Sequence, residues 1–218
     1  LRISQSGLPP GQPFILFRSD VTRRDDSAQS LLQRMGVVDS AAAAFLRSDA
    51  TARELLAGRA GKLVTVETND HNEVLRLTAR WLAKPDAREF RRLSIERQGQ
   101  GFGAQVEDAP LQASAQLSSG TVQSSLFAAT DAVRLPDSVA SQLADIFSSE
   151  IDFRRDLRKG DRFSIVYESL EADGEVLRAG RILSAEFVND GKRLQTMWFQ
   201  EPGRKGGYLT FDGQSQQR

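Results

Sequence analysis

Apolar side chains in the first third of the chain recur at helical spacing before an alternating pattern takes over. The spacing predicts a helix over residues 27–35, with Gly36 placed to end it. A second, alanine-rich helix is expected from Ser40, and a short helical turn over 51–57. The apolar face of the first helix is formed by Leu31, Leu32 and Met35.

Alternation of apolar and polar residues then predicts a pair of strands. One strand is expected over 61–68 and its partner over 73–81, joined by a polar turn at Asn69-Asp70. A short apolar run at 13–17 predicts a further buried strand near the start of the chain.

The remainder of the chain has more strand-like than helical pattern. Three runs at 90–98, 101–108 and 113–119 predict strands, and residues 124–133 and 137–149 predict two helices. Four more strand-like runs follow from Arg162, and Asp-Gly pairs between alternating runs are strong hairpin signals because these residues tolerate positive φ. The pairs are Asp173-Gly174, Asp190-Gly191 and Asp212-Gly213.

These elements predict an α+β protein with an antiparallel β-meander in its second part. Residues 1–13 are rich in Gly, Pro and Ser and predict a linker. We expect a first domain over 14–82, a connector at 83–87 and a second α+β domain over 88–218.

One short pattern occurs in both parts of the chain. Gly61 and Gly160 each follow a helical stretch and lead into a strand whose apolar residues alternate. One interpretation is a glycine that ends a helix and is followed by a half-buried strand. The alternative is a helix-helix-strand unit used twice, as in small glycan-binding modules of the LysM kind.

Composition excludes several classes of chemistry. The 218 residues contain 29 basic and 29 acidic side chains, so no net charge favours nucleic acid, which we do not expect as a partner. There is no Cys, which removes disulfides, thiolate nucleophiles and Cys-ligated metal. No apolar run approaches the roughly 20 residues that span a bilayer.

The candidate catalytic side chains do not form a recognisable site. His71 is the single histidine and lies in a turn composition, so neither a zinc site nor a Ser-His-Asp triad is expected. Trp81, Trp198 and Tyr208 are interpreted as core residues, with a glycan-stacking surface as the alternative. A carboxylate enzyme is the third-ranked hypothesis, because interleaved Arg and Lys favour an ion-pair network around Glu150, Asp152, Asp156 and Asp161.

Two long runs give the chain a resemblance to a known family. Residues 121–132 (TVQSSLFAATDA) and 143–168 (LADIFSSEIDFRRDLRKGDRFSIVYE) resemble the segment that precedes the catalytic domain in LytM-type, lysostaphin-like zinc DD-endopeptidases of Gram-negative bacteria. Residues 181–189 and 207–215 continue the likeness. Residues 21–32 look like the degenerate LysM-like first domain of the same proteins, although Asp25 stands where such modules usually have Gly.

The resemblance implies a role without catalysis for this stretch. The family binds zinc through a His-x-x-x-Asp motif and a later His-x-His, and neither motif occurs here, so no catalytic, metal or cofactor residue is carried over. Zinc is expected in a downstream catalytic domain. The implied function is a regulatory or targeting region of a periplasmic peptidoglycan endopeptidase, which covers the active-site cleft or positions it on murein.

The implied partners are the protein's own catalytic domain and peptidoglycan. Because the sequence starts at Leu1 and not at Met, we also expect an upstream signal or inner-membrane anchor. The alternative function is a stand-alone glycan-binding or scaffold protein of the cell envelope. In LysM-like units the loops beside the helices form the glycan groove, so the candidate contacts for a glycan or a lid are Arg24, Asp25, Asp26, Ser27, Arg59 and Lys62.

Overall fold

The computed structural model describes residues 14–211 of the chain. The chain divides into two compact units between Pro110 and Leu111. The linker expected over 1–13 and the hairpin expected at Asp212-Gly213 lie outside the described residues.

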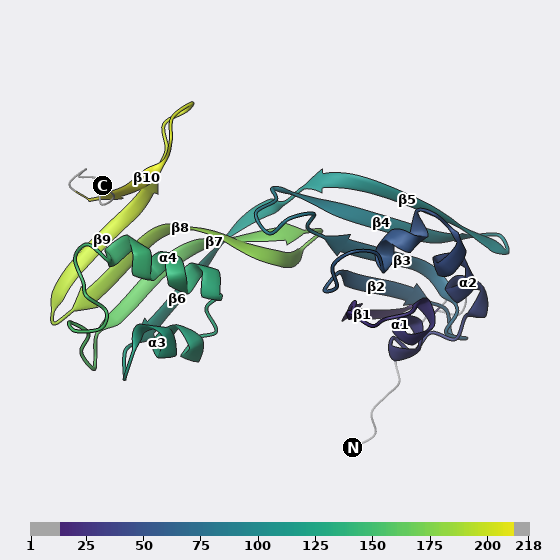
Figure 1. The fold of residues 1–218 in the computed structure, drawn as a ribbon, viewed down its shortest axis with the longest axis horizontal. Coiled ribbons are helices and arrows are strands. Elements are labelled where there is room, and N and C mark those ends of the chain that lie inside the picture. Colours follow the sequence, from purple (N-terminus) through teal and green to yellow (C-terminus); the bar gives the residue numbers. More distant parts are fainter. Residues whose placement is uncertain (1–13, 212–218) are drawn as a thin grey trace, which may run out of the picture. The chain divides into compact units, whose positions relative to one another are not determined.

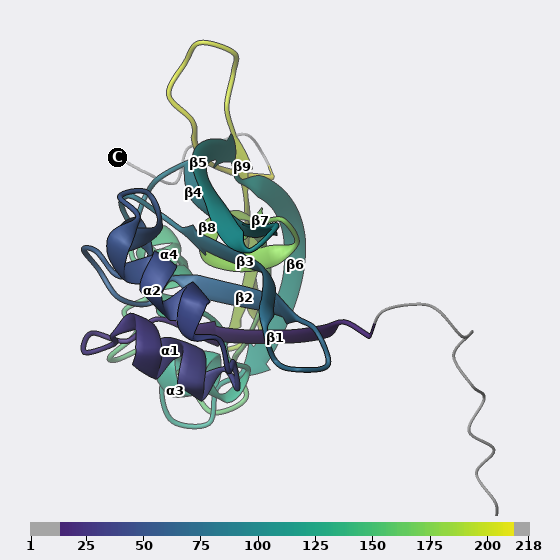
Figure 2. The same cartoon turned by 90° about the vertical axis from the view of Figure 1, so that its right-hand side faces the viewer.

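The first unit is a five-stranded antiparallel sheet with its helices on one face (Figures 1 and 2). The strands follow the chain, in the order β1-β2-β3-β4-β5, so that β1 and β5 form the edges. Its elements are β1 (Leu16–Val21), α1 (Ala28–Arg34), α2 (Ser40–Ser48), the 3-10 helix η1 (Ala52–Leu55), β2 (Leu63–Thr68), β3 (Val74–Trp81), β4 (Glu89–Gln98) and β5 (Gly101–Pro110).

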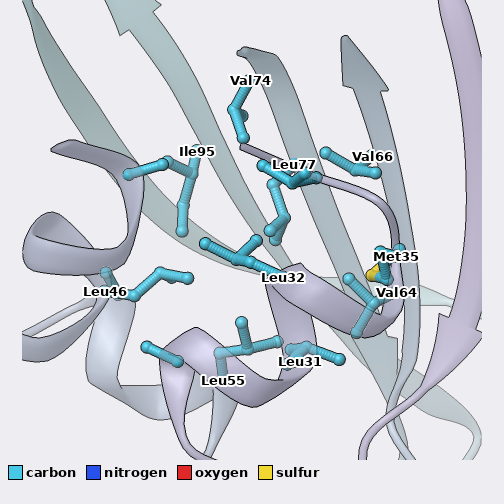
Figure 3. Close-up of a cluster of buried hydrophobic side chains, with 14 of the residues drawn as sticks. Leu31, Leu32, Met35, Leu46, Leu55, Val64, Val66, Val74, Leu77 and Ile95 are labelled. Atoms are coloured by element: carbon cyan, nitrogen blue, oxygen red, sulfur yellow. The ribbon is translucent and has the colours of Figure 1, made fainter. Parts of the chain in front are cut away.

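Short polar side chains set where these helices begin. The Ser27 hydroxyl accepts from the N–H of Ser30, and the Ser30 hydroxyl accepts from the N–H of Ser27, so α1 starts with a reciprocal cap. Asp39 caps α2 by accepting from the N–H of Ala42 at 2.9 Å. Between the helices and the sheet lies one apolar core, shown in Figure 3, which includes Leu31, Leu32, Met35, Leu46, Leu55, Val64, Val66, Val74, Leu77 and Ile95.

The second unit has its own five-stranded antiparallel sheet, in the order β10-β9-β8-β7-β6. Two helices cover one face of it, and a separate core lies between the helices and the sheet. Val139, Leu143 and Phe147 supply the buried stripe of the longer helix. The elements are β6 (Gln112–Thr121), α3 (Leu126–Ala132), α4 (Asp137–Phe147), β7 (Arg162–Ala172), β8 (Glu175–Asn189), β9 (Lys192–Phe199) and β10 (Gly207–Thr210).

The expected domain boundary at 83–87 is wrong. That segment is the turn between β3 and β4, which pair with each other antiparallel from Arg76↔Glu96 to Trp81↔Arg91. Strands β4 and β5 therefore complete the sheet of the first unit, and the division falls after Pro110. A Pro in a polar turn marks a hairpin as well as a linker, and the pattern does not distinguish the two.

The buried strand expected at 13–17 is also displaced. The strand runs over Leu16–Val21 at the edge of the sheet, and Phe14 and Phe17 are 54% and 65% exposed. Pairing of Phe17 with Glu67 of β2 fixes the register, and it turns Phe17 to the face of the sheet opposite the helices.

The two units share one topology. Each has an edge strand, a helical stretch and then a four-stranded meander whose first strand pairs with that edge strand. The matching glycines close the same contact in both: the N–H of Gly61 donates to Thr22 O at 2.8 Å, and that of Gly160 donates to Val122 O at 2.9 Å. The helix-helix-strand unit, which was the alternative interpretation of Gly61 and Gly160, therefore occurs in both units.

Candidate functional site

A groove of about 410 Å³ lies in the first unit, between the loop that follows β1 and the segment that joins η1 to β2. Three of its lining side chains are arginines and none is acidic. The lining residues are Thr22, Arg23, Arg24, Leu55, Leu56, Gly58, Arg59 and Ala60.

One wall of the groove is held by an ion-pair cluster. Arg34 of α1 contacts Asp26 with its Nη1 at 2.6 Å and Asp20 with its Nε at 2.8 Å. Asp26 also accepts from the N–H of Arg23 at 2.7 Å, which fixes the start of the loop. The hydrogen bond from Arg34 lowers the pKa of Asp26 to about 2, and the carboxylate stays ionised at neutral pH.

The other wall is held by Lys62, which is 5% exposed. Its ammonium group donates to the carbonyl oxygens of Glu54 and Ala57, the latter at 2.7 Å, and thereby satisfies the end of η1. The Nζ atom also lies 4.3 Å from the centre of the Trp81 ring. Burial lowers the pKa of Lys62. The contacts of its ammonium group with these carbonyl oxygens and the Trp81 ring place it inside the wall.

Two hydrogen bonds between Thr22 and Lys62 join the two walls. Thr22 N–H donates to Lys62 O at 2.9 Å, and the N–H of Lys62 donates to the Thr22 hydroxyl at 3.0 Å. Gly58 and Gly61 adopt φ of +70° and +91°, a region that glycine occupies without steric cost. The groove is therefore preformed by its own scaffold.

The structure brings together only part of the predicted contact set. Arg24 and Arg59 both line the groove, whereas Asp25 is exposed and outside its lining. Asp26 and Lys62 hold the walls, and Ser27 caps α1, so these three act in the scaffold.

Sequence reasoning missed Arg23. It follows the buried Thr22 and lines the groove with Arg24. The adjacent Arg-Arg pair after a strand end was the signal in the sequence. The loop conformation that brings both side chains to the groove depends on the hydrogen bond from the N–H of Arg23 to Asp26.

The arginines of the groove have no salt-bridge partner among residues 14–211. None of Arg23, Arg24 and Arg59 forms a salt bridge with another residue of that range. Of the acidic groups nearby, Asp20 and Asp26 pair with Arg34, and Glu54 lies 3.4 Å from Arg91, whereas Asp25 is exposed next to Arg24.

The carboxylates around residues 150–161 mainly hold their own loop together. Asp152 accepts from the N–H of Arg154 at 2.9 Å, and Asp156 accepts from the N–H of Asp152 at 2.9 Å. One ion pair of the expected network is present, Asp152 with Arg155 at 3.7 Å, and Arg158 pairs instead with Asp190 at 3.3 Å. The loop is a hydrogen-bonded turn with a solvated charged surface.

Asp161 closes that loop from inside. It is 5% exposed and accepts from the N–H groups of Arg158 and Asp190 at 2.8 and 2.9 Å. Burial opposes its ionisation, but these bonds and one from the Asn189 amide outweigh burial and lower its pKa.

Zinc does not fit the residues that the structure describes. In residues 14–211 no group of three or more His, Cys, Asp and Glu side chains could hold a metal ion. His71 is exposed in the β2–β3 turn, with its Nε2 3.7 Å from Asp70.

The aromatic residues pack against the cores. Trp81 lies beside Lys62, and Trp198 meets Tyr208 edge-on with ring centres 5.1 Å apart. Tyr208 is 6% exposed and donates to Ile182 O at 2.9 Å, and burial raises its pKa to about 12. Trp198 also carries the Arg181 guanidinium 4.3 Å above its ring.

Among the helices of residues 14–211, none combines the length and the apolar character that a bilayer crossing requires.

No protein-family model matches the chain. A stretch of 50 residues is 40% identical to part of the peptidoglycan DD-endopeptidase ShyC of Vibrio cholerae and covers 23% of this chain and 12% of that protein. The chain thus matches about an eighth of the length of this relative.

Solved structures resemble the chain over a greater length. Helicobacter pylori Csd3 matches with a TM-score of 0.51 and 15% identity in one crystal form, and 0.50 and 13% in another, covering 88% of this chain and 50% of Csd3 in both. A zinc-containing peptidase from Vibrio cholerae gives a TM-score of 0.48 at 19% identity, over 92% of this chain and 59% of its own. The chain therefore has the fold of about half of Csd3, and a short part of it is similar in sequence to a peptidoglycan DD-endopeptidase.

Proposed function

We propose that the chain is the non-catalytic front region of a periplasmic peptidoglycan endopeptidase of the zinc metallopeptidase type. The similarity to ShyC over 50 residues supports this assignment, because it links the chain to a protein that acts on peptidoglycan. Peptidoglycan lies in the bacterial envelope, so the proposed location is the periplasm.

Within that protein the first unit either covers the active-site cleft or positions the enzyme on murein. The observation that carries this proposal is the preformed groove, whose three arginines have no acidic partner among the described residues. A rigid, charged groove with no catalytic group in its lining is suited to binding. A groove of this kind is suited to bind either the enzyme's own catalytic domain or peptidoglycan.

Zinc would belong to a catalytic domain joined after this region, since the described residues do not fit it. The proposed partners are that catalytic domain and peptidoglycan. An upstream inner-membrane anchor is part of the same proposal.

Deletion of the first unit from the complete endopeptidase tests the role. The complete protein is compared with a form lacking residues 1–110, because each unit has its own sheet and core. A cover predicts faster cleavage of both intact sacculi and soluble stem peptides after deletion. A positioning unit predicts slower cleavage of sacculi and unchanged cleavage of soluble peptides.

Zinc content and the thermal unfolding of both forms serve as controls. They ensure that a change in rate does not come from metal loss or misfolding. Equal rates on both substrates would reject both roles.

The repeated topology of the two units favours a second candidate, a stand-alone glycan-binding or scaffold protein built from LysM-like modules. The downstream coding sequence separates the two. A His-x-x-x-Asp motif followed by His-x-His supports the endopeptidase, and a stop codon soon after Arg218 supports the scaffold.

A further inference from the structure

We infer that the groove lined by Arg23, Arg24 and Arg59 binds a peptide carrying free carboxylates, namely the peptide stem of peptidoglycan, and not the neutral sugar chain. This rests on the proposed function for its biological setting. The ligand chemistry is argued from the groove itself.

The first argument is charge. The lining contains three arginines and no acidic side chain, and three of the acids around it, Asp20, Asp26 and Glu54, are engaged by Arg34 or Arg91. A guanidinium presents a planar fork of donors that matches a carboxylate, often through two parallel hydrogen bonds. Three such groups at one groove suit a ligand with more than one carboxylate.

The second argument is the absence of a sugar platform. None of the eight lining residues is aromatic. A neutral sugar ring presents a face of C–H groups, and the usual partner for such a face is the flat, amphipathic surface of Trp or Tyr. Trp81 does not line the groove, and the Lys62 ammonium lies over its ring at 4.3 Å from the centre.

The third argument is that the groove is already organised. Asp26 fixes one wall through the N–H of Arg23, and Lys62 fixes the other through Ala57 O. Binding to a preformed site loses less conformational entropy than binding that must order a loop. The volume of about 410 Å³ falls within the range of about 300–1,000 Å³ typical of small-ligand sites.

Binding of three soluble probes to the 218-residue chain tests the inference. The probes are a disaccharide-tetrapeptide muropeptide, the same muropeptide with its carboxylates converted to amides, and chitotetraose. We expect the acidic muropeptide to bind, amidation to weaken it at least tenfold, and chitotetraose to bind no better than the amide. Raising salt from 50 to 500 mM should also weaken the acidic muropeptide several-fold.

A variant pair locates the site. The double substitution Arg24→Gln/Arg59→Gln should weaken the acidic muropeptide at least tenfold. The matched control Arg47→Gln/Arg88→Gln changes two exposed arginines that do not line the groove and should leave affinity unchanged. Amide spectra of both variants check that the fold is intact.

Several results would overturn the inference. They are equal binding of the acidic and amidated muropeptides, tighter binding of chitotetraose, no binding of any probe, or an unchanged affinity of the double variant. If no probe binds while deletion of residues 1–110 accelerates cleavage, the groove serves the catalytic domain, and the proposed function stands without this ligand. If the acidic muropeptide binds while that deletion changes nothing, the ligand stands and the proposed role fails.

Discussion

Lys62 and Asp161 occupy equivalent positions in the two units. Both are buried charged side chains that form hydrogen bonds to backbone groups, although their charges are opposite. Each follows a glycine of positive φ, each accepts a backbone hydrogen bond from the residue after the edge strand, and each is 5% exposed. The Lys62 ammonium donates to carbonyl oxygens of its preceding segment, whereas the Asp161 carboxylate accepts from N–H groups. The same backbone conformation therefore accommodates a buried lysine or a buried aspartate, provided that carbonyl oxygens face the lysine and N–H groups face the aspartate.

Removal of the Asp161 carboxylate should destabilise the second unit. Asp161→Ala leaves two backbone N–H groups without their acceptor and removes one of the two hydrogen bonds of the Asn189 amide, and we expect a loss of about 2–3 kcal/mol in the free energy of unfolding. Urea unfolding followed by tryptophan fluorescence measures it. In a Trp81→Phe background Trp198 alone reports, and it lies in the second unit.

Asp145→Asn is the control for this measurement. Asp145 is an exposed acid on α4, and its substitution should change stability by no more than about 0.5 kcal/mol. A loss of less than about 1 kcal/mol for Asp161→Ala would mean that water replaces the carboxylate.

The equivalent glycines give a second test of the repeat. Gly61 and Gly160 have φ of +91° and +96°, and the space that a Cβ would occupy is open at both, so an alanine there is strained by its backbone alone. We expect Gly61→Ala and Gly160→Ala each to cost about 1–2 kcal/mol, in the first and second unit respectively.

Gly207→Ala is the matched control, since Gly207 has neither positive φ nor a close neighbour. Its stability should stay within about 0.5 kcal/mol of the parent. Unequal costs at Gly61 and Gly160, by more than about twofold, would argue against equivalence of the two turns.

The pH dependence of the first unit should depend on Asp26. Its pKa is about 2 in the folded protein against 3.8 ordinarily, so the folded state favours the ionised form. The stabilisation is therefore fully present above about pH 4 and is lost as the pH falls from about 4 to about 2. Asp26→Asn should cost about 1–2 kcal/mol at pH 7, because the largely buried carboxylate loses its charge-assisted hydrogen bonds to Arg34.

Urea unfolding of the first unit between pH 2 and pH 7 measures this, with Trp81 as the reporter in a Trp198→Phe background. The stability gap between parent and variant should close as the pH approaches 2. A difference in the free energy of unfolding that remains constant over that interval would show that the ionised form of Asp26 does not stabilise the first unit through Arg34.

Local pattern predicted the helices and the hairpins, because each depends on residues close in sequence, whereas the helix-helix-strand repeat was only an alternative interpretation of Gly61 and Gly160. The helices at 27–35 and 137–149 and the turns at Asp173-Gly174 and Asp190-Gly191 appear where expected. The division after Pro110 was missed, because it depends on which strands pair in space. The alternating sequence pattern of β4 and β5 is the same whether these strands join the preceding or the following sheet.

The candidate site was predicted in part for a related reason. Exposed loop charges such as Arg24 and Arg59 can be selected from the sequence as surface residues. Whether a charge lies in the groove or supports it depends on long-range partners, such as Arg34 for Asp26 and the η1 carbonyls for Lys62. No local pattern contains that information.

The side chain of Gln142 on α4 completes the backbone hydrogen bonding of β8 at a break in its register with β7. The pairing shifts between Val166 and Tyr167, and the Gln142 amide spans the adjoining stretch of β8. Its Nε2 donates to Gly180 O at 2.9 Å, and its Oε1 accepts from the N–H of Ile182 at 3.0 Å. Ile182 itself is fully buried, so its N–H has little access to water.

Gln142→Ala should therefore cost about 2–3 kcal/mol, because one buried donor and one acceptor lose their partners together. Gln142→Glu should be at least as costly, since a carboxylate accepts from Ile182 but cannot donate to Gly180 O. Ser141→Ala, at the neighbouring exposed position of α4, should keep the free energy of unfolding within about 0.5 kcal/mol of the parent.

Urea unfolding reported by Trp198 gives the free energies, and hydrogen exchange at Ile182 gives the local effect. Faster exchange at Ile182 in Gln142→Ala, with no change in Ser141→Ala, is the expected result, and unchanged exchange in both would show that the amide bridge does not protect β8.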